Sequence, residues 1–382
     1  MGVTKMDEKE KTYLMALAQI PGFDQVYIKA LAEEFPSFAD AWKNGREWKN
    51  ALPISKDRLE FILHGKEMVD PEKIYVYSQK INVKICTVED QDYPAALREV
   101  NRNPYFFYYF GTLPRREEFL FTIVGMRQCS RYGRDVAEKI AGDLVRAAKM
   151  TIVSGMALGI DAAAHLGALK AGGRTIAVLP SGIDEIYPAE NRGLYTEIKE
   201  QGCLLTEYPF HFTPIRATFP YRNRLMSGLG RGVLIVEGRN NSGAMHTVNH
   251  GLEQGKDIFA IPGSIFVSNS EAPHQSIKLG AKLVTGADDI LLEYFDLEQV
   301  KAWLAESSAV APDMDAFSPV GKKIWASLRE GPLYFDEIQY LSEMEPAALA
   351  TLLTEWELEG YVDSLPGKVY SIANTIKEVN NE

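Results

Sequence analysis

The chain has few cysteines and no long apolar run. Its three cysteines are Cys86, Cys129 and Cys203. They lie far apart without a C-x-x-C pair, which excludes a disulfide framework and a structural zinc site. The longest apolar runs, Phe119–Gly125 and Gly232–Val236, fall far short of the ~20 residues that span a bilayer, and the segment Met1–Lys11 is charged. We therefore expect no membrane span, no secretory signal and a reducing, cytoplasmic location.

The usual nucleotide and metal motifs are also absent. The chain has neither G-x-G-x-x-G with an acidic ribose partner nor G-x-x-x-x-G-K-[ST], which excludes the phosphate loops of dinucleotide oxidoreductases and P-loop ATPases. His246 and His250 have the i, i+4 spacing of zinc ligands, but Thr247 stands where a metalloprotease needs its general-base Glu. The sequence thus predicts no cofactor, no metal and no catalytic residue.

Basic charge is scarce overall but unevenly distributed. The formal net charge is -11. Residues 121–295 carry 18 basic and 17 acidic side chains, whereas residues 315–382 carry 5 and 12. The middle segment can therefore hold a local positive site that the net charge hides, and the tail is the part least suited to bind phosphate.

The N-terminal part, residues 1–110, is expected to be a small helical domain with a connector. Thr12–Phe35 has an apolar period near 3.6 that is interrupted at Ile20–Phe23, which predicts two short helices joined by a tight turn. Such a hairpin can place N–H groups against a DNA phosphate, but it is more often part of a helical bundle. The aromatic run Pro104–Gly111 could stack on bases, although a strand would place most of its rings in the core.

Residues 111–300 are expected to form a doubly wound α/β domain, because β-branched runs alternate with helical stretches. Ligands of such sheets bind beyond the carboxyl ends of the strands. The predicted strands are Phe119–Gly125, Met150–Gly155, Arg174–Leu179, Cys203–Tyr208, Gly232–Glu237 and Asp257–Ile261. The predicted helices are Tyr132–Lys149, Ile160–Ala171, Asn191–Gln201, Arg222–Leu229 and Gly243–Gln254.

The last part of the chain is predicted to be a winged helix over residues 320–382, preceded by a linker over residues 301–319. Three helical patterns, Val320–Leu328, Phe335–Leu341 and Pro346–Glu359, are followed by two short extended runs around Gly367. The third helix would be the recognition helix, yet it carries Glu355, Glu357 and Glu359 without lysine or arginine. We therefore expect it to contact protein rather than duplex DNA.

Two glycine-rich loops follow the first two strands of the middle domain. In the first loop, Gly125, Arg127 and Ser130 precede a helix, an arrangement that can accept an anion. The second loop contains Ser154, Gly155 and Gly159. There Asp161, and His165 one turn further along the helix, are interpreted as orienting the loop and its N–H groups. Glycine is also common in purely structural strand-to-helix turns, so each loop alone favours a site only weakly.

The third feature is more specific. Arg216, Phe219, Arg222 and Arg224 place one aromatic ring among three arginines before a helix. Arginine suits phosphate oxygens, and a ring can stack on any base. The alternative is a solvated charged turn with Phe219 in the core. A fourth loop with Ser242 and Gly243 again joins a strand to a helix, so four loops would line one edge of the sheet.

Taken together, these motifs resemble the DNA-processing protein A (DprA, or Smf) family. The matching stretches are Gly125–Gly133, Ser154–His165, Phe219–Leu229, Ser242–Thr247 and Pro262–Ser264. The resemblance extends to the long members, which combine an N-terminal sterile-alpha-motif-like domain, an extended Rossmann domain and a C-terminal winged helix. It implies a cytoplasmic homodimer without catalytic activity that binds single-stranded DNA during natural transformation and loads the RecA recombinase. The matching pocket residues are Arg127, Ser154, Gly155, Arg216, Phe219, Arg222 and Arg224.

One stretch departs from the family pattern. Members usually show Ser-x-Gly-x-Asn-x-Leu-Ile after the Pro-Gly-Ser turn, whereas this chain has Ser270–Ile277 without that glycine and asparagine. The role of this loop is therefore open.

The alternative is a related Rossmann enzyme of the phosphoribohydrolase type, whose motif Pro-Gly-Gly-x-Gly-Thr-x-x-Glu corresponds to Ser242–His250. His250 stands at the Glu position, so glycosidic cleavage lacks its carboxylate. A pure protein scaffold is a third possibility, but it leaves the arginines and glycine loops unexplained.

Overall fold

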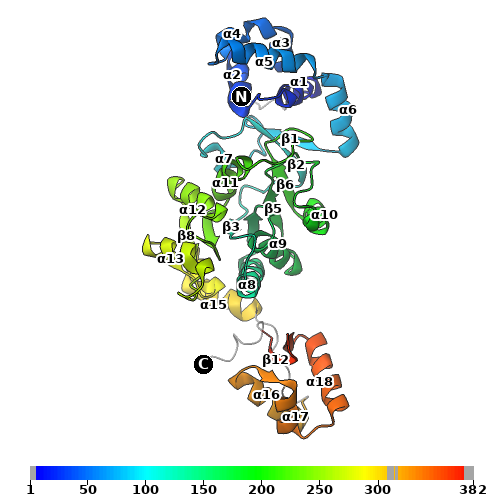
Figure 1. Ribbon diagram of the computed structural model, residues 1–382, viewed down its shortest axis with the longest axis vertical. Helices are drawn as coiled ribbons and strands as arrows, with labels where there is room; N and C mark the ends of the chain where they lie inside the picture. Colours follow the sequence, from blue (N-terminus) through cyan, green and yellow to red (C-terminus); the bar gives the residue numbers. More distant parts are fainter. Residues whose placement is uncertain (1–5, 308–313, 315–316, 374–382) are drawn as a thin grey trace. The chain divides into compact units, whose positions relative to one another are not determined.

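The computed structural model describes residues 6–307, 314 and 317–373, and the chain divides into two compact units (Figure 1). The first unit runs to Tyr294 and the second begins at Phe295. The predicted linker over residues 301–319 lies partly outside the described residues. Its first part is helical, because α15 (Leu297–Ser307) continues to Ser307. The domain boundaries at residues 110 and 300 stay predictions.

The first unit begins with a set of short helices. They are α1 (Glu8–Gln19), α2 (Gln25–Glu34), α3 (Phe38–Lys43), α4 (Trp48–Ala51), α5 (Lys56–Glu67) and α6 (Pro71–Ile81). Most of them start at an Asp or Ser whose side chain accepts a hydrogen bond from the first turn: Asp7, Asp24, Ser37, Ser55 and Asp70. The predicted hairpin between α1 and α2 is confirmed, and Gly22 makes its turn with φ +71°.

Nine strands form one sheet in the described part of the chain, in the order β1-β2-β6-β5-β4-β3-β7-β8-β9. The strands are β1 (Lys84–Thr87), β2 (Phe106–Gly111), β3 (Leu120–Val124), β4 (Thr151–Ser154), β5 (Thr175–Val178), β6 (Cys203–Thr206), β7 (Gly232–Ile235), β8 (Asp257–Ala260) and β9 (Lys282–Leu283). Strands β3 to β9 pair in parallel, whereas β1 and β2 are antiparallel. The predicted doubly wound sheet is confirmed, with a mixed rather than purely parallel pairing.

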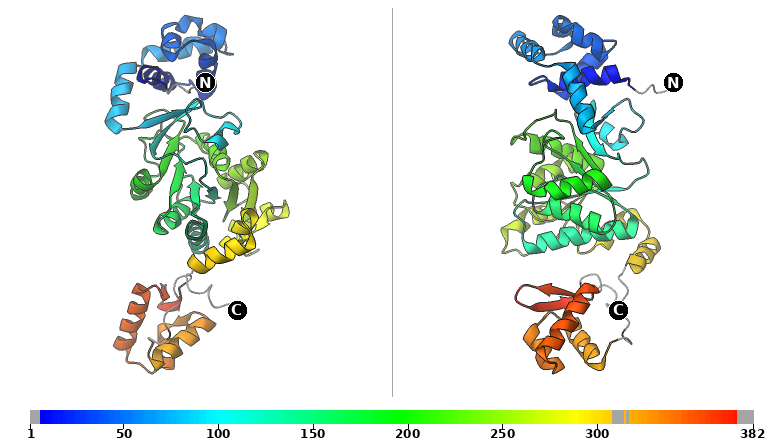
Figure 2. Two further views of the ribbon diagram at one scale, coloured as in Figure 1. Left: turned by 180° about the vertical axis from the view of Figure 1, so that it is seen from behind. Right: turned by 90° about the vertical axis from the view of Figure 1, so that its right-hand side faces the viewer.

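The crossover helices cover both faces of this sheet (Figure 1 and Figure 2). The helices α8 (Arg131–Ala148), α9 (Ile160–Lys170) and α10 (Arg192–Gln201) lie on one face, and α11 (Thr218–Leu229) and α12 (Gly243–Glu253) lie on the other. From β3 the chain first builds β4, β5 and β6 on one side and then returns to place β7 and β8 on the other. The reversal lies between β3 and β7, where open α/β sheets bind their ligands.

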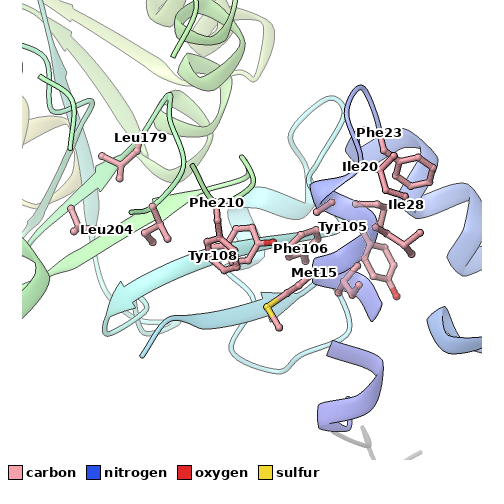
Figure 3. Close-up of a cluster of buried hydrophobic side chains, with 14 of the residues drawn as sticks. Met15, Ile20, Phe23, Ile28, Tyr105, Phe106, Tyr108, Leu179, Leu204 and Phe210 are labelled. Atoms are coloured by element: carbon pink, nitrogen blue, oxygen red, sulfur yellow. The ribbon is translucent and has the colours of Figure 1, made fainter. Parts of the chain in front are cut away.

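A shared hydrophobic cluster joins the N-terminal helices to the sheet (Figure 3). Ile20, Phe23 and Ile28 of the helical part belong to the same cluster as Phe106 and Tyr108 of β2. All five side chains are buried, so the helical part and the sheet stabilise one another through apolar burial. The aromatic run is thus core, as the alternation of a strand predicts, and not a base-stacking platform.

Three further helices of the middle region flank the sheet strands along the chain. The short α7 (Ala95–Arg98) precedes β2, and α13 (Glu271–Lys278) and α14 (Ala287–Tyr294) follow β8 and β9. The predicted strands and helices between residues 119 and 261 are all present. One start differs: α11 begins at Thr218 rather than at Arg222, which puts Phe219 in the first turn of the helix.

The second unit holds the expected winged helix. Its elements are α16 (Pro319–Glu330), β10 (Leu333–Tyr334), α17 (Phe335–Ser342), α18 (Pro346–Leu358), β11 (Val362–Leu365) and β12 (Val369–Ile372). Trp325 and Trp356 pack edge to face with ring centroids 5.9 Å apart in its core. Glu355 and Glu357 on α18 and Glu359 at its C-cap are exposed. Over the described residues, no helix of either unit is both long and apolar enough to cross a membrane.

Candidate nucleic-acid interface

A cavity of about 380 Å³ lies at the carboxyl ends of the parallel strands, where the order of the sheet reverses. The loops after β3, β4, β6 and β7 all contribute to it. Its lining includes seven of the predicted DNA-binding residues and the predicted orienting residue Asp161: Gly125, Arg127, Asp161, Arg216, Phe219, Arg222, Ser242 and Gly243. The structure therefore brings together residues from all four loops that the sequence singles out.

The mouth of the cavity carries a ring and two exposed cations. Phe219 is half-buried, and the Arg127 guanidinium lies 4.4 Å from the centroid of its ring. Tyr187 packs against the same ring, edge to face, at 5.7 Å. Arg127 and Arg216 are both exposed. This arrangement offers an aromatic face for stacking next to free positive charge, the combination that suits single strands.

Arg222 and Asp161 are the buried residues at the floor of the cavity. Arg222 is only 3% exposed, and its Nη1 donates to the carbonyl oxygens of Gly155, at 2.9 Å, and Val178. Asp161 Oδ2 accepts from the backbone N–H of Ala157 at 3.4 Å, which is the orienting contact expected of it. A Cβ on Gly155 would lie 2.6 Å from Arg222 Nη2 and 2.7 Å from Asp161 Oδ2, so a larger residue there would displace these two buried groups.

Gly159 shapes the second loop without lining the cavity. Its φ of +81° favours glycine, and a Cβ there would lie 2.4 Å from the carbonyl oxygen of Arg127. The two glycine-rich loops therefore touch each other through their backbones. Gly159 allows this close backbone packing, and Gly155 leaves room for Arg222 and Asp161. The predicted contact of both glycines with DNA has no support in the cavity lining.

At the N-terminus of α8, Ser130 donates to a carboxylate of the same chain, so its predicted contact with a DNA phosphate has no support in the structure. The Glu237 carboxylate accepts hydrogen bonds from the Ser130 backbone N–H at 2.8 Å and from the Ser130 hydroxyl at 2.5 Å. The Ser130 Oγ in turn accepts from the N–H of Gly133. A second anion at this helix end would be repelled by the carboxylate, so this part of the first loop is structural.

Arg224 also departs from its predicted role. It is 4% exposed, and its guanidinium donates to both carboxylate oxygens of Glu207, at 2.6 and 2.7 Å. The same group donates to the carbonyl of Arg102 and lies 3.9 Å from the centroid of the Tyr221 ring. Arg224 does not line the cavity. The structure therefore gives no support to Arg224 as a phosphate clamp, because its donors are used inside the protein.

Ser154 and His165 lie under the site rather than in it. The Ser154 hydroxyl, fully buried, donates to the carbonyl of Ile123 at 2.7 Å. His165 Nδ1 lies 2.6 Å from Thr175 Oγ1, and burial lowers the pKa of His165 to about 3, so the ring is neutral. His165 thus contacts β5 and does not orient the loop, contrary to the prediction.

The start of α12 includes residues that the sequence analysis missed. Thr247 and His246 line the cavity together with Ser242 and Gly243. Thr247 is 1% exposed, and its hydroxyl has no hydrogen-bond partner among the described residues. The helical period could have indicated Thr247, since a residue four positions after Gly243 lies on the same face of the helix as Gly243.

Two other features are structural. In the hairpin between α1 and α2, the Asp24 carboxylate accepts from Val26 N and Tyr27 N, so this helix end meets its own acidic cap rather than a phosphate. In the atypical stretch after β8, His274 Nε2 lies 3.0 Å from the carbonyl of Gly263, and Ala272 N donates to Gly238 O. That stretch therefore supports the turn after β8 and the loop after β7.

Binding of anions in the cavity is expected to strengthen as the pH falls. Burial raises the pKa of Asp161 to about 6, against the opposing effect of Arg222, so protonation near that pH removes a negative charge from the floor. Single-strand affinity measured between pH 7.5 and 5.5 should rise, and Asp161→Asn should flatten the profile. Because His246 also lines the cavity, His246→Ala is the control. A profile unchanged by Asp161→Asn would contradict this account.

Known proteins resemble this chain in sequence and in fold. Residues 84–295 match the family model described as DNA recombination-mediator protein A, and residues 308–368 match the DprA winged helix domain. The chain is 31% identical to protein Smf of Synechocystis over 96% of this chain and 99% of that protein. The chain belongs to the DNA recombination-mediator protein A family.

Other members support the same assignment. The DNA processing protein DprA of Streptococcus pneumoniae is 40% identical over 54% of this chain and 73% of its own length. An X-ray structure of DprA from the same organism covers 77% of this chain and 99% of that chain, with a TM-score of 0.65. The resemblance noted in the sequence, including the long form with a winged helix, is thereby confirmed.

Proposed function

We propose that this member of the DprA family binds single-stranded DNA in the cavity between β3 and β7, with little preference for sequence. The observation that carries the proposal is the half-buried ring of Phe219 beneath the exposed Arg127, with Arg216 on the same cavity. A ring stacks on any base, and arginines contact phosphates without reading base edges. This combination favours flexible single strands over stacked duplex.

The test is a competition between single-stranded and duplex DNA for the full chain at several salt concentrations. We expect the protein to bind the single strand more tightly than the duplex. The slope of log affinity against log salt concentration should be roughly -0.7 for each phosphate neutralised. Affinity that does not depend on salt, or a preference for duplex, would reject the proposal.

We further propose that the protein delivers the RecA recombinase to the bound strand during natural transformation, in the cytoplasm. Membership in a family of recombination mediators supports this role. The three free cysteines, of which Cys86 and Cys203 are buried, are consistent with a reducing compartment. Single-strand-dependent stimulation of RecA filament assembly tests the role, and its absence at saturating protein counts against it.

A homodimer is part of the same proposal. The sheet ends at β9, a short edge strand, where Leu283 is 44% exposed and nearby Leu279 is 67% exposed. An open edge with exposed leucines favours pairing with a second copy. Sedimentation of the full chain should give a dimer that Leu283→Glu disrupts, and a monomer at micromolar concentration would rule it out.

We propose no catalytic activity. Among the described residues that line the cavity, the carboxylate is Asp161, which is buried beside Arg222, and His250 stands where the related hydrolases have their Glu. Incubation with nucleoside monophosphates should release no free base. Release that His250→Ala abolishes would favour the enzyme instead.

The winged helix is expected to contribute little to single-strand binding. Its part of the chain, residues 315–382, carries 12 acidic and 5 basic side chains, and Glu355 and Glu357 on α18 and Glu359 at its C-cap are exposed. Like charges repel at low salt, so deleting residues 320–382 should leave affinity within about threefold, or raise it. Both chains should be measured in one low-salt buffer, and a tenfold loss with the remainder folded would show that the tail binds DNA.

A further inference from the structure

One carboxylate joins the N-terminal helices to the loops at the carboxyl ends of β5 and β6. Asp184, in the loop after β5, has a side chain that is only 7% exposed. Its carboxylate accepts from the Tyr77 hydroxyl of α6 at 2.8 Å and lies 2.7 Å from His211 Nδ1 in the loop after β6. It also accepts from the His211 backbone N–H at 2.9 Å. Three segments that are far apart in the sequence therefore meet at a single side chain.

Tyr77 takes part in this cluster with its ring as well as its hydroxyl. The ring packs against Phe210 at 5.4 Å between centroids and against His211 at 4.8 Å. Phe210 in turn packs against Tyr108 of β2 at 4.7 Å, within the hydrophobic cluster of Figure 3. Burial and the hydrogen bond to Asp184 raise the pKa of Tyr77 to about 12, so the hydroxyl keeps the proton that it donates.

The loops after β5 and β6 are fixed to each other at this point. Gly182 N donates to Phe212 O at 2.9 Å, and a Cβ on Gly182 would lie 2.5 Å from the carbonyl oxygen of Pro209. His211 has a φ of +59°, which is uncommon for a residue other than glycine. Such a backbone persists only where the surroundings fix it, and here the Asp184 carboxylate holds both the backbone N–H and the ring of His211.

The loop after β5 leads from this cluster to the stacking ring of the cavity. Three residues after Asp184, Tyr187 packs edge to face against Phe219, with ring centroids 5.7 Å apart. The backbone of Phe219 is fixed by the first turn of α11, whereas the orientation of its ring depends on the side chains packed against it. The position of Tyr187 is therefore expected to affect how Phe219 presents its face to a base.

A second route to the same ring runs along the loop after β6. Phe212, the residue after His211, stacks on Tyr208 with centroids 4.9 Å apart and 12° between the ring planes. The Tyr208 hydroxyl donates to the carbonyl of Thr218 at 3.3 Å. Thr218 directly precedes Phe219 in the first turn of α11. Packed side chains and hydrogen bonds of this kind can carry coupling between distant residues.

We propose that Tyr77 is a positioning residue for single-strand binding, which holds the loops after β5 and β6 through Asp184 and thereby sets the Phe219 ring for stacking on a base. The inference rests on the proposed function and adds to it a role for the N-terminal helices, which do not line the cavity. Loosening α6 from Asp184 lowers single-strand affinity through the ring and leaves the phosphate contacts intact.

The test is an anisotropy titration of the full chain and its variants with a labelled thymidine oligomer. Tyr77→Phe removes only the hydroxyl and keeps the ring in its packing. It should weaken binding about threefold to tenfold, with the salt slope unchanged. Tyr75→Phe is the matched control on the same helix, because the Tyr75 hydroxyl donates to Glu8 Oε2 and not to the loops of the sheet. This control should leave the affinity unchanged.

A double-mutant cycle separates positioning of the ring from a general loss of structure. In the Phe219→Ala background, Tyr77→Phe should have no further effect, since the ring that it positions is gone. A loss of the same size in both backgrounds would overturn the inference, and so would a Tyr77→Phe variant that binds as tightly as the original. A loss for Tyr75→Phe equal to that for Tyr77→Phe would overturn it as well.

The outcomes also distinguish this role from the proposed function. If Phe219→Ala weakens binding while Tyr77→Phe does not, the single-strand function stands and the positioning role is rejected. If Phe219→Ala leaves binding unchanged, both are rejected.

Discussion

Replacing Phe219 with alanine is expected to weaken single-strand binding by about 1 to 3 kcal/mol, roughly fivefold to 150-fold. The ring is half-buried at the cavity mouth, where it can stack on a base. It carries no charge, so the slope of log affinity against log salt should hardly change. Fluorescence anisotropy with a labelled thymidine oligomer measures both quantities.

Two comparisons keep this result interpretable. Phe61→Ala removes a 51% exposed ring from α5, away from the cavity, and should not change binding. Arg216→Ala removes an exposed cation and should reduce the salt slope by roughly 0.7 while the ring remains. If Phe219→Ala unfolds the protein, the ring belongs to the core and the alternative derived from the sequence is correct.

Arg224→Ala is expected to destabilise the fold by about 3 to 5 kcal/mol, because it leaves the buried Glu207 carboxylate without its partner. The pair ties α11 to the end of β6, and Arg224 also donates to the carbonyl of Arg102 before β2. Chemical unfolding of the full chain measures the loss. Arg216→Ala, the exposed control, should leave the unfolding midpoint within error.

A different result for Arg224→Ala would contradict this structural role. A variant that unfolds at the original midpoint but binds single-stranded DNA more weakly would show that Arg224 contacts phosphate, as the sequence suggests. The two arginines separated by one residue, Arg222 and Arg224, are therefore expected to differ: one lies on the floor of the site and the other holds the helix that carries it.

The sheet and the position of the site could be predicted from sequence because they depend on local patterns. Short β-branched runs such as Gly232–Val236, separated by helical stretches, specify a doubly wound fold. In that fold the loops after the strands must meet at one edge. The importance of Gly155 and Gly159 could be predicted for the same reason, since tight turns after strands need glycine.

The side-chain partners of the residues at that edge of the sheet could not be predicted from local patterns. Arginine is usually exposed, and nothing local indicates that Arg224 is buried on Glu207, 17 residues earlier in the chain. Glu237 likewise reaches Ser130 only because β7 lies next to β3 in the sheet. Side-chain partners from separate loops depend on tertiary geometry. The sequence therefore predicts that Ser130 and Arg224 contact DNA, whereas in the structure both bond to carboxylates that hold the loops and helices around the cavity in place.

The most direct test of the central proposal is to locate the bound strand by photocrosslinking. The full chain would be irradiated with a thymidine oligomer that carries one 5-bromodeoxyuridine, and the crosslinked peptide identified by mass spectrometry. Stacking on the cavity mouth predicts crosslinks at Phe219 or at Tyr187, which packs against it, and their loss in Phe219→Ala. Crosslinks confined to the α1–α2 hairpin or to the winged helix would contradict the account.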